Sequence, residues 1–149
     1  MGVRWRSREE LRRRLTAAGY EPDDVDVALS DLEEAGLIDD ARFAQELVRD
    51  RAIHRLSGDR AIAATLRQRG VSGEVAGRAL EGAGDEGDRA RRLASLRAER
   101  LTEVEPETAF RRLFGLLVRR GFSPGLAREA AREALRRALS PGCVPDEDP

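Results

Sequence analysis

Few residues in this chain have the type and spacing that catalysis requires. A nucleophile and its base need a Ser or Cys beside a His, a Lys or a tuned carboxylate, and the chain has one His, one Cys and no Lys. His54 stands in a charged helical stretch, as surface histidines do. Cys143 stands in an acidic, Pro-rich tail, where nothing is arranged to lower a thiol pKa. We therefore expect no catalytic centre.

One acidic pair, Asp39 and Asp40, could suggest a metal site or an acid–base pair. The pair begins a helical segment, where carboxylates accept backbone N–H bonds and favour the positive end of the helix dipole. The run Asp23-Asp24-x-Asp26 resembles a fragment of a calcium loop but lacks its Gly and its closing Glu. The chain also has no phosphate-binding Gly loop. The sequence thus predicts no metal, no cofactor and no enzyme.

The charges are balanced overall but unevenly placed. The net charge is −1, all 27 basic residues are Arg, and residues 101–149 carry eight charges of each sign. Between 49 and 69, however, six arginines face only Asp50 and Asp59. This region is either a solvated face with internal ion pairs or a contact surface for phosphates or an acidic protein groove. The predicted partner-binding residues are Arg49, Arg51, Arg55, Arg60, Arg67 and Arg69.

A helical unit recurs every 51 residues. Gly19, Gly70 and Gly121 each follow an i,i+4 apolar pair and precede an apolar residue. A Gly in this place closes a helix, because it adopts the left-handed backbone freely. The next helix follows after Ser72 or Ser123 as an N-cap. The unit is therefore a helix, a Gly–apolar joint and a second helix.

The helical periodicity predicts an all-α fold, an elongated array of tandem three-helix repeats with the third repeat truncated. The expected helices span 8–18, 23–35, 40–55, 58–69, 73–82, 86–101, 107–120 and 124–139. We divide the chain into repeat 1 (7–56), repeat 2 (57–103), repeat 3 with two helices (104–140) and a disordered acidic tail (141–149). The N-terminus has no hydrophobic signal segment and no apolar run approaches transmembrane length. We expect a cytoplasmic monomer.

The middle of the chain carries three motifs in succession: Gly36-Leu-Ile-Asp39-Asp40-Ala-Arg-Phe43-Ala, then Arg49-Asp-Arg51, then Ile62-x-x-x-Leu66-x-x-Arg69-Gly70. This succession resembles the RecX family, bacterial regulators of the RecA recombinase. The resemblance is strong over 36–80 and remains in register over about 7–139. Its structural positions are Asp39, Asp40 and Phe43, and its basic positions are Arg49, Arg51, Arg60, Arg67 and Arg69.

This resemblance implies tandem three-helix repeats that bind in the groove of the RecA filament and suppress ATP hydrolysis, strand exchange and co-protease activity. It also implies weak binding to single- or double-stranded DNA. Two other classes remain open. The chain could be a stand-alone, weak nucleic-acid-binding module that uses residues 49–69 and the arginines around Arg12-Arg13-Arg14, or a helical adaptor for another protein.

Overall fold

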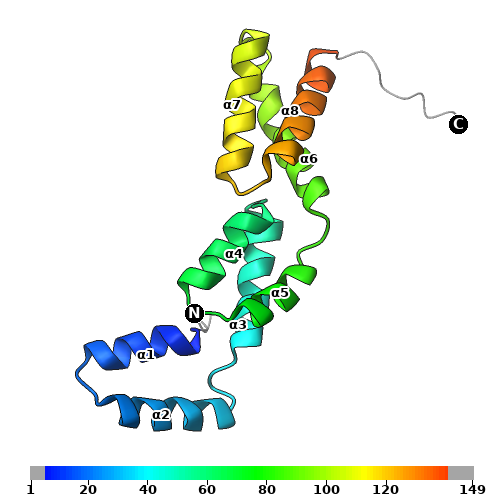
Figure 1. Ribbon diagram of the computed structural model, residues 1–149. Coiled ribbons are helices and arrows are strands. Elements are labelled where there is room, and N and C mark those ends of the chain that lie inside the picture. Colours follow the sequence, from blue (N-terminus) through cyan, green and yellow to red (C-terminus); the bar gives the residue numbers. More distant parts are fainter. Residues whose placement is uncertain (1–5, 141–149) are drawn as a thin grey trace, which may run out of the picture. The chain divides into compact units, whose positions relative to one another are not determined.

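The computed structural model describes residues 6–140, and every regular element in that range is a helix (Figure 1). The elements are α1 (Arg8–Ala17), α2 (Pro22–Glu34), α3 (Asp40–Arg49), the π-helical turn η1 (Asp50–His54), α4 (Asp59–Gln68), α5 (Gly73–Glu81), α6 (Glu86–Ala98), the 3-10 turn η2 (Glu99–Leu101), α7 (Pro106–Arg119) and α8 (Pro124–Leu139). The predicted all-α class and helix map are confirmed. The predicted third and sixth helices end as η1 and η2, and the predicted tail lies outside the described residues.

The repeated glycines end their helices as the sequence predicts. Gly19, Gly70 and Gly121 have φ of +94°, +77° and +96°. After each Gly, the next amide donates to the carbonyl five residues earlier, at 3.0–3.2 Å. This arrangement satisfies carbonyls that the helix end would leave unpaired. The apolar residue after Gly is buried for Phe122, which is 1% exposed, but not for Tyr20, which is 60% exposed.

The hydrophobic residues form three separate clusters. Val25, Leu29 and Ile38 form a small one, supported by Leu11 and Leu15 of α1. The second joins α3, η1, α4 and α5 around Ile62 and Leu66. The third joins α6, α7 and α8 around Leu113, Leu117 and Phe122. Each cluster holds one group of consecutive helices together by burying their apolar faces.

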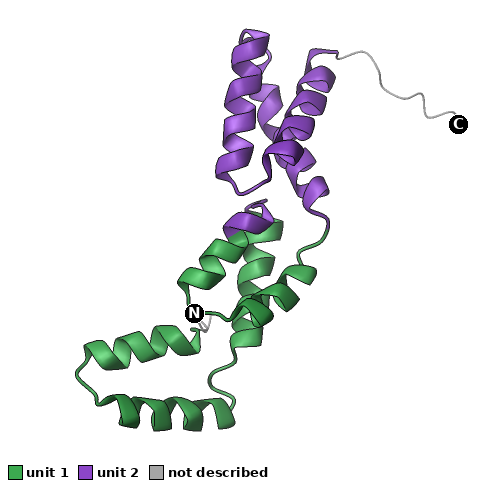
Figure 2. Ribbon diagram, viewed as in Figure 1, with its two compact units in different colours: residues 1–54, 62–84 green, residues 55–61, 85–149 purple. Residues whose placement is uncertain are grey.

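Contacts divide the chain into two compact units (Figure 2). One comprises residues 1–54 and 62–84, and the other comprises residues 55–61 and 85–149. The division falls inside α4, whose residues 59–61 belong with the second unit.

The hydrophobic clusters group the helices differently from the predicted repeats. The prediction placed α3 with α1 and α2, whereas α3 packs on α5 and shares its core with α4. Phe43 and Val48 of α3 are 7% and 2% exposed within that core. Among the described helices, the two-helix group is therefore α1–α2, and α6–α8 form a complete three-helix group. A period of 51 residues does not say where each unit begins.

Candidate partner-binding surface

The six arginines predicted to bind a partner lie on and beside α3 and α4. Arg49 ends α3, Arg51 belongs to η1, and Arg60 and Arg67 are seven residues apart on α4. Four of the six are exposed, namely Arg49, Arg55, Arg60 and Arg67. Arg51 and Arg69 are half-buried.

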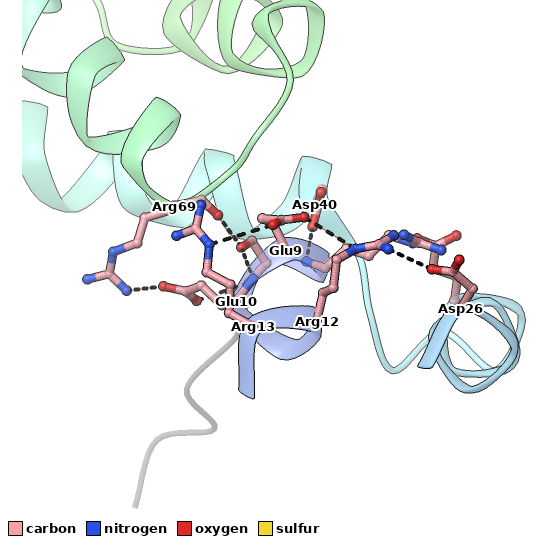
Figure 3. A network of polar contacts seen from close by, with 10 residues as sticks. Glu9, Glu10, Arg12, Arg13, Asp26, Asp40 and Arg69 are labelled. Carbon is pink, nitrogen blue, oxygen red and sulfur yellow. Dashed lines mark hydrogen bonds and ion pairs between the residues drawn. The ribbon is translucent and has the colours of Figure 1, made fainter. Parts of the chain in front are cut away.

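Arg69 is engaged within the fold. Its Nη1 donates to Oε1 of Glu10 at 2.5 Å, and its backbone carbonyl accepts the hydroxyl of Ser7 (Figure 3). Glu10 in turn closes the capping box of α1 with Ser7. Because its charge is matched by Glu10, Arg69 is the weakest candidate of the six for contact with a partner.

The remaining arginines are mostly unmatched. Arg55 has a partner within the fold. Four of the six form no ion pair with any residue between 6 and 140: Arg49, Arg51, Arg60 and Arg67. Guanidinium groups without a carboxylate partner keep their five N–H donors available for a phosphate or a carboxylate.

A cavity of about 350 Å³ lies where α3 and η1 meet α5. Its lining consists of Gln45, Val48, Arg49, Ile53, Arg78, Ala79 and Gly82. Val48 and Ala79 are buried and apolar, whereas Ile53 is 57% exposed. The lining of the cavity therefore includes both apolar residues and the two arginines Arg49 and Arg78.

Arg78 was not predicted as a site residue. In sequence it follows Glu74 by four residues on one helix, and its Nη2 does pair with Oε1 of Glu74 at 2.8 Å. Its place beside Arg49 depends on the packing of α5 against α3. Sequence periodicity alone does not predict that Arg78 lies near Arg49.

The two residues of the acidic pair have different partners in the first unit, and Asp40 is the one that joins α1 to α3 (Figure 3). Asp39 caps α3 by accepting the amide of Arg42 at 3.1 Å, as predicted. Asp40 instead accepts the amide of Arg8, in the first turn of α1, at 2.8 Å. The prediction that both carboxylates cap one helix is therefore corrected, because each acid serves a different helix N-terminus.

Three of the N-terminal arginines form contacts inside the first unit. Arg8 pairs with Glu33 at 2.6 Å, and Arg12 pairs with Asp26 at 2.7 Å. Arg13 donates to the carbonyl of Gln68 at 3.0 Å and lies near Glu9. These contacts fasten α1 to α2 and to the end of α4. They leave this cluster less available to nucleic acid than the sequence suggested.

A similar contact recurs in the second unit, about 51 residues further along the chain. In the first unit the N-terminus of α1 meets the Arg69–Gly70 joint through Ser7 and Glu9. In the second unit the amide of Gly58 donates to the carbonyl of Arg120 at 2.8 Å, and Ala61 lies directly against Gly121. We call this arrangement the joint contact, in which a helix N-terminus rests on a later Gly joint.

The acidic part of the contact recurs as well. Glu86 accepts the amide of Asp59 at 3.0 Å, as Asp40 accepts that of Arg8. Asp85 caps α6 through the amide of Asp88, as Asp39 caps α3. The pair Asp85-Glu86 follows Asp39-Asp40 by 46 residues. Because this interval differs from the 51-residue interval of the glycines, a search at the 51-residue period does not find the second acidic pair.

In the second unit a buried arginine occupies the position of Phe43. Arg89 is only 6% exposed. It donates from Nη1 to the carbonyl of Ser57 at 2.9 Å and from Nη2 to Oδ1 of Asp59 at 2.5 Å. Its Nε has no partner among the described residues. A buried guanidinium needs such acceptors, so Arg89 is a structural residue that sequence analysis missed.

Between residues 6 and 140 no group of three or more His, Cys, Asp or Glu side chains could hold a metal ion. No helix in that part of the chain is long and apolar enough to cross a membrane.

Comparison with known proteins identifies the family. A model of the second three-helix domain of RecX matches residues 39–80, which span α3–α5. The crystal structure of RecX from Lactobacillus salivarius has the same fold, with a TM-score of 0.76 at 22% identity over 87% of this chain and 86% of that one. A second crystal structure, of a regulatory protein RecX, gives a TM-score of 0.72 over 87% of this chain and 64% of that one.

Curated relatives are more similar in sequence. The regulatory protein RecX of Mycobacterium avium is 47% identical over 132 residues, or 85% of this chain and 75% of the relative. That of Corynebacterium efficiens is 41% identical over 139 residues, or 89% of this chain and 66% of the relative. The chain thus spans two thirds to three quarters of the length of these two relatives. With such identity over most of its residues, the chain belongs to the RecX family of regulatory proteins.

Proposed function

We propose that this protein is a negative regulator of the RecA recombinase. It binds the RecA–DNA filament and lowers the filament's ATP hydrolysis, strand exchange and co-protease activity, and so modulates DNA repair and recombination. Membership of the RecX family supports this proposal. The protein acts by binding rather than catalysis, as a monomer in the cytoplasm.

The observation that carries the proposal is the set of unmatched arginines in the segment that matches the family model. Arg49, Arg51 and Arg67 belong to residues 39–80 and form no ion pair with any described residue. Arg60 of the same segment also lacks one. A filament of protein and DNA offers both carboxylates and phosphates, and Arg binds either in a bidentate way. Unmatched arginines on helices suit such a partner better than arginines already paired.

The cavity between α3 and α5 adds a second element to this surface. Arg49 and Arg78 lie at its lining beside buried Val48 and Ala79. An apolar side chain of the filament that is flanked by a carboxylate would fit this combination. We propose that this cavity gives the contact specificity, while the surrounding arginines add charge attraction.

The test measures DNA-dependent ATP hydrolysis by the recombinase with increasing amounts of the purified protein. We expect hydrolysis to fall with the amount of protein added. The charge reversals Arg49→Glu, Arg60→Glu and Arg67→Glu should each raise the half-maximal inhibitory concentration by about two- to fivefold, as for the loss of ~0.5–1 kcal/mol from an exposed charge contact.

Arg92→Glu is the matched control. Arg92 is also exposed on a helix and forms no ion pair among the described residues, so the reversal changes net charge equally. It should leave inhibition unchanged. Unaltered ATP hydrolysis at a several-fold molar excess of wild-type protein over filament would refute the proposed function. Equal effects of Arg92→Glu and Arg67→Glu would refute the proposed surface.

A further inference from the structure

Helix α8 carries a row of arginines that the described part of the fold leaves without carboxylate partners. Arg128, Arg132 and Arg136 follow one another at intervals of four residues, and all three are exposed. Helix positions four residues apart lie about 6 Å apart along the axis and on nearly the same side. We call these three residues the arginine row. None of them forms an ion pair with any residue between 6 and 140.

Aromatic rings hold two members of the arginine row in place. The guanidinium of Arg128 lies over the ring of Phe114, 5.9 Å from its centroid, and that of Arg132 lies over the ring of Phe110 at 5.7 Å. The two rings stack on each other with their centroids 5.8 Å apart. A ring positions a guanidinium without occupying its N–H donors. Arg128 and Arg132 are therefore oriented cations whose N–H groups remain available to carboxylates.

The carboxylates on the same helix do not neutralise the arginine row. Glu133 pairs with Arg137 at 2.6 Å, and Glu129 forms no ion pair among the described residues. Helices α7 and α8 together, over residues 106–140, contain eight arginines and three glutamates. This surface therefore keeps a positive excess that a further set of acids would complement.

Such acids follow α8 directly in the sequence. Residues 141–149, here called the tail, read Pro-Gly-Cys-Val-Pro-Asp-Glu-Asp-Pro and contain three acids and no basic residue. Pro followed by Gly is typical of the two central positions of a type II turn, so the sequence predicts a chain reversal over residues 140–143. Ser140 has already left the helical backbone, with φ of −119° and ψ of 69°. The sequence thus favours a tail that runs back along α8.

The spacing of the acids matches the spacing of the arginine row. An extended chain rises about 3.3 Å per residue and alternates sides, so Asp146 and Asp148 lie about 6.6 Å apart on one side. Counted from the end of the predicted turn, these two aspartates lie about 10 and 17 Å back along the chain. Arg132 and Arg128 lie about 11 and 17 Å from the end of α8. Each aspartate therefore reaches one arginine of the row.

We propose that the arginine row is a docking surface for the tail of the same chain, with Asp146 bound to Arg132 and Asp148 bound to Arg128. So short a connection gives the acids an effective concentration on the order of mM, which supports contacts too weak to hold separate molecules together. Leu139, 52% exposed at the end of the row, offers Val144 an apolar contact just after the turn. The docked tail covers the cations of α8, so any other anionic ligand of this face has to displace it.

The test places a nitroxide spin label at the end of the tail and measures the broadening of backbone amide signals in the full chain. Cys143→Ser with Pro149→Cys gives the label a single attachment site. A docked tail brings the label to the N-terminal half of α8, so broadening should be strongest over residues 124–130. Without docking, broadening should be strongest over residues 136–140, which lie nearest the attachment point. Salt at 1 M shortens the Debye length to about 3 Å and should convert the first pattern into the second.

Charge variants of the labelled protein identify the contacts. Arg132→Gln, or Asp146→Asn with Asp148→Asn, should lower the ratio of docked to free tail by about 1.5- to 5-fold for each exposed ion pair lost. Arg137→Gln is the matched control, because it removes the same charge from the same helix. Arg137 is paired with Glu133 and lies about 140° around α8 from Arg132, so this change should leave the pattern unaltered. Circular dichroism checks that each variant keeps its helices.

Three results would overturn the docked tail. The first is broadening at low salt that is strongest over residues 136–140 and declines toward 124–130. The second is a docked pattern that persists at high salt or in Asp146→Asn with Asp148→Asn. The third comes from mixing spin-labelled protein with isotope-labelled protein that carries no spin label. Equal broadening over 124–130 in that mixture would assign the arginine row to the tail of a second copy. None of these outcomes involves the recombinase, so the proposed function is tested separately.

Discussion

The three repeated glycines allow a graded test of how the helices pack. Gly19, Gly70 and Gly121 share a left-handed backbone, with φ of +94°, +77° and +96°. Their surroundings differ. A Cβ at Gly19 would meet open space, a Cβ at Gly70 would collide with Cβ and Cγ of Glu9, and a Cβ at Gly121 would collide with Ala61, including its backbone amide at 2.5 Å.

Alanine at each position therefore has a different expected cost. The left-handed backbone costs an L-residue roughly 1–2 kcal/mol, and the loss of unfolded-state freedom offsets about 0.4–1 kcal/mol of it. Gly19→Ala should lower the free energy of unfolding by about 1 kcal/mol. Overpacking adds about 1–3 kcal/mol, so Gly70→Ala and Gly121→Ala should each lose about 2–4 kcal/mol. The larger loss belongs to Gly121, where the obstacle includes backbone.

The assay is urea denaturation followed by far-ultraviolet circular dichroism, with amide hydrogen exchange to locate the loss. Gly77→Ala is the control, because Gly77 lies inside α5 with negative φ and open space around it. That change should stabilise the protein by about 0.5–1 kcal/mol. Gly19 and Gly70 lie in the same unit. Equal losses for Gly19→Ala and Gly70→Ala would therefore refute the idea that the joint contact sets the difference.

Three further predictions concern individual side chains. Arg89→Met removes a buried cation from its acceptors and should lower the free energy of unfolding by about 1–3 kcal/mol. This is less than for a fully buried ion pair, because the carboxylate partner Asp59 is 43% exposed. An unchanged urea midpoint would contradict the prediction. Hydrogen bonds from the backbone amides of Glu107 and Thr108 hold the pKa of the Glu105 carboxyl below its usual value. The stabilising contribution of Glu105 is therefore present above the ordinary pKa and is lost as pH falls through the lowered pKa. The melting temperature should thus fall more steeply between pH 7 and pH 3 for the wild type than for Glu105→Gln. Equal pH dependence of the two melting temperatures would count against this. Asp40→Ala removes the acceptor for Arg8 and should lower the protection of the first amides of α1 by about 1–2 kcal/mol in hydrogen exchange; unaltered protection would show that α1 is held by other contacts.

The helices were predictable because their ends are encoded locally. Ser7, Asp39, Ser72 and Ser123 cap their helices with their own side chains. The Gly joints close helices through backbone geometry that no distant residue needs to supply. Signals of this kind can be read within a few residues, and this is why the helix boundaries agree to within a few positions outside η1 and η2.

The grouping of the helices was not predictable in the same way. A repeat fixes the interval between equivalent positions, and any point along it can be taken as its start. Only packing shows that Phe43 and Val48 of α3 share a core with Ile62 and Leu66 of α4. The change from a 51-residue interval at the glycines to a 46-residue interval at the acidic pairs further obscured the equivalence of α3 and α6.

The site residues depended on contacts between distant segments. Arg69 looked as free as Arg67 in the sequence, yet Glu10, 59 residues earlier, neutralises it. Arg78 entered the cavity only through the packing of α5 on α3. The arginines of α7 and α8 did not stand out in the sequence because residues 101–149 carry eight charges of each sign. Local charge therefore has to be summed over faces rather than over sequence windows.

The first turn of α4 determines where the second unit can be cut from the chain. A fragment that began at residue 85 would contain α6, α7 and α8 with every buried residue of their apolar cluster. It would still lack the carbonyl of Ser57 and the carboxylate of Asp59, so the buried guanidinium of Arg89 would lose both acceptors. The carbonyl of Arg120 would lose the amide of Gly58 too. The smallest self-sufficient piece of this half must therefore include a short segment that lies almost thirty residues upstream of α6.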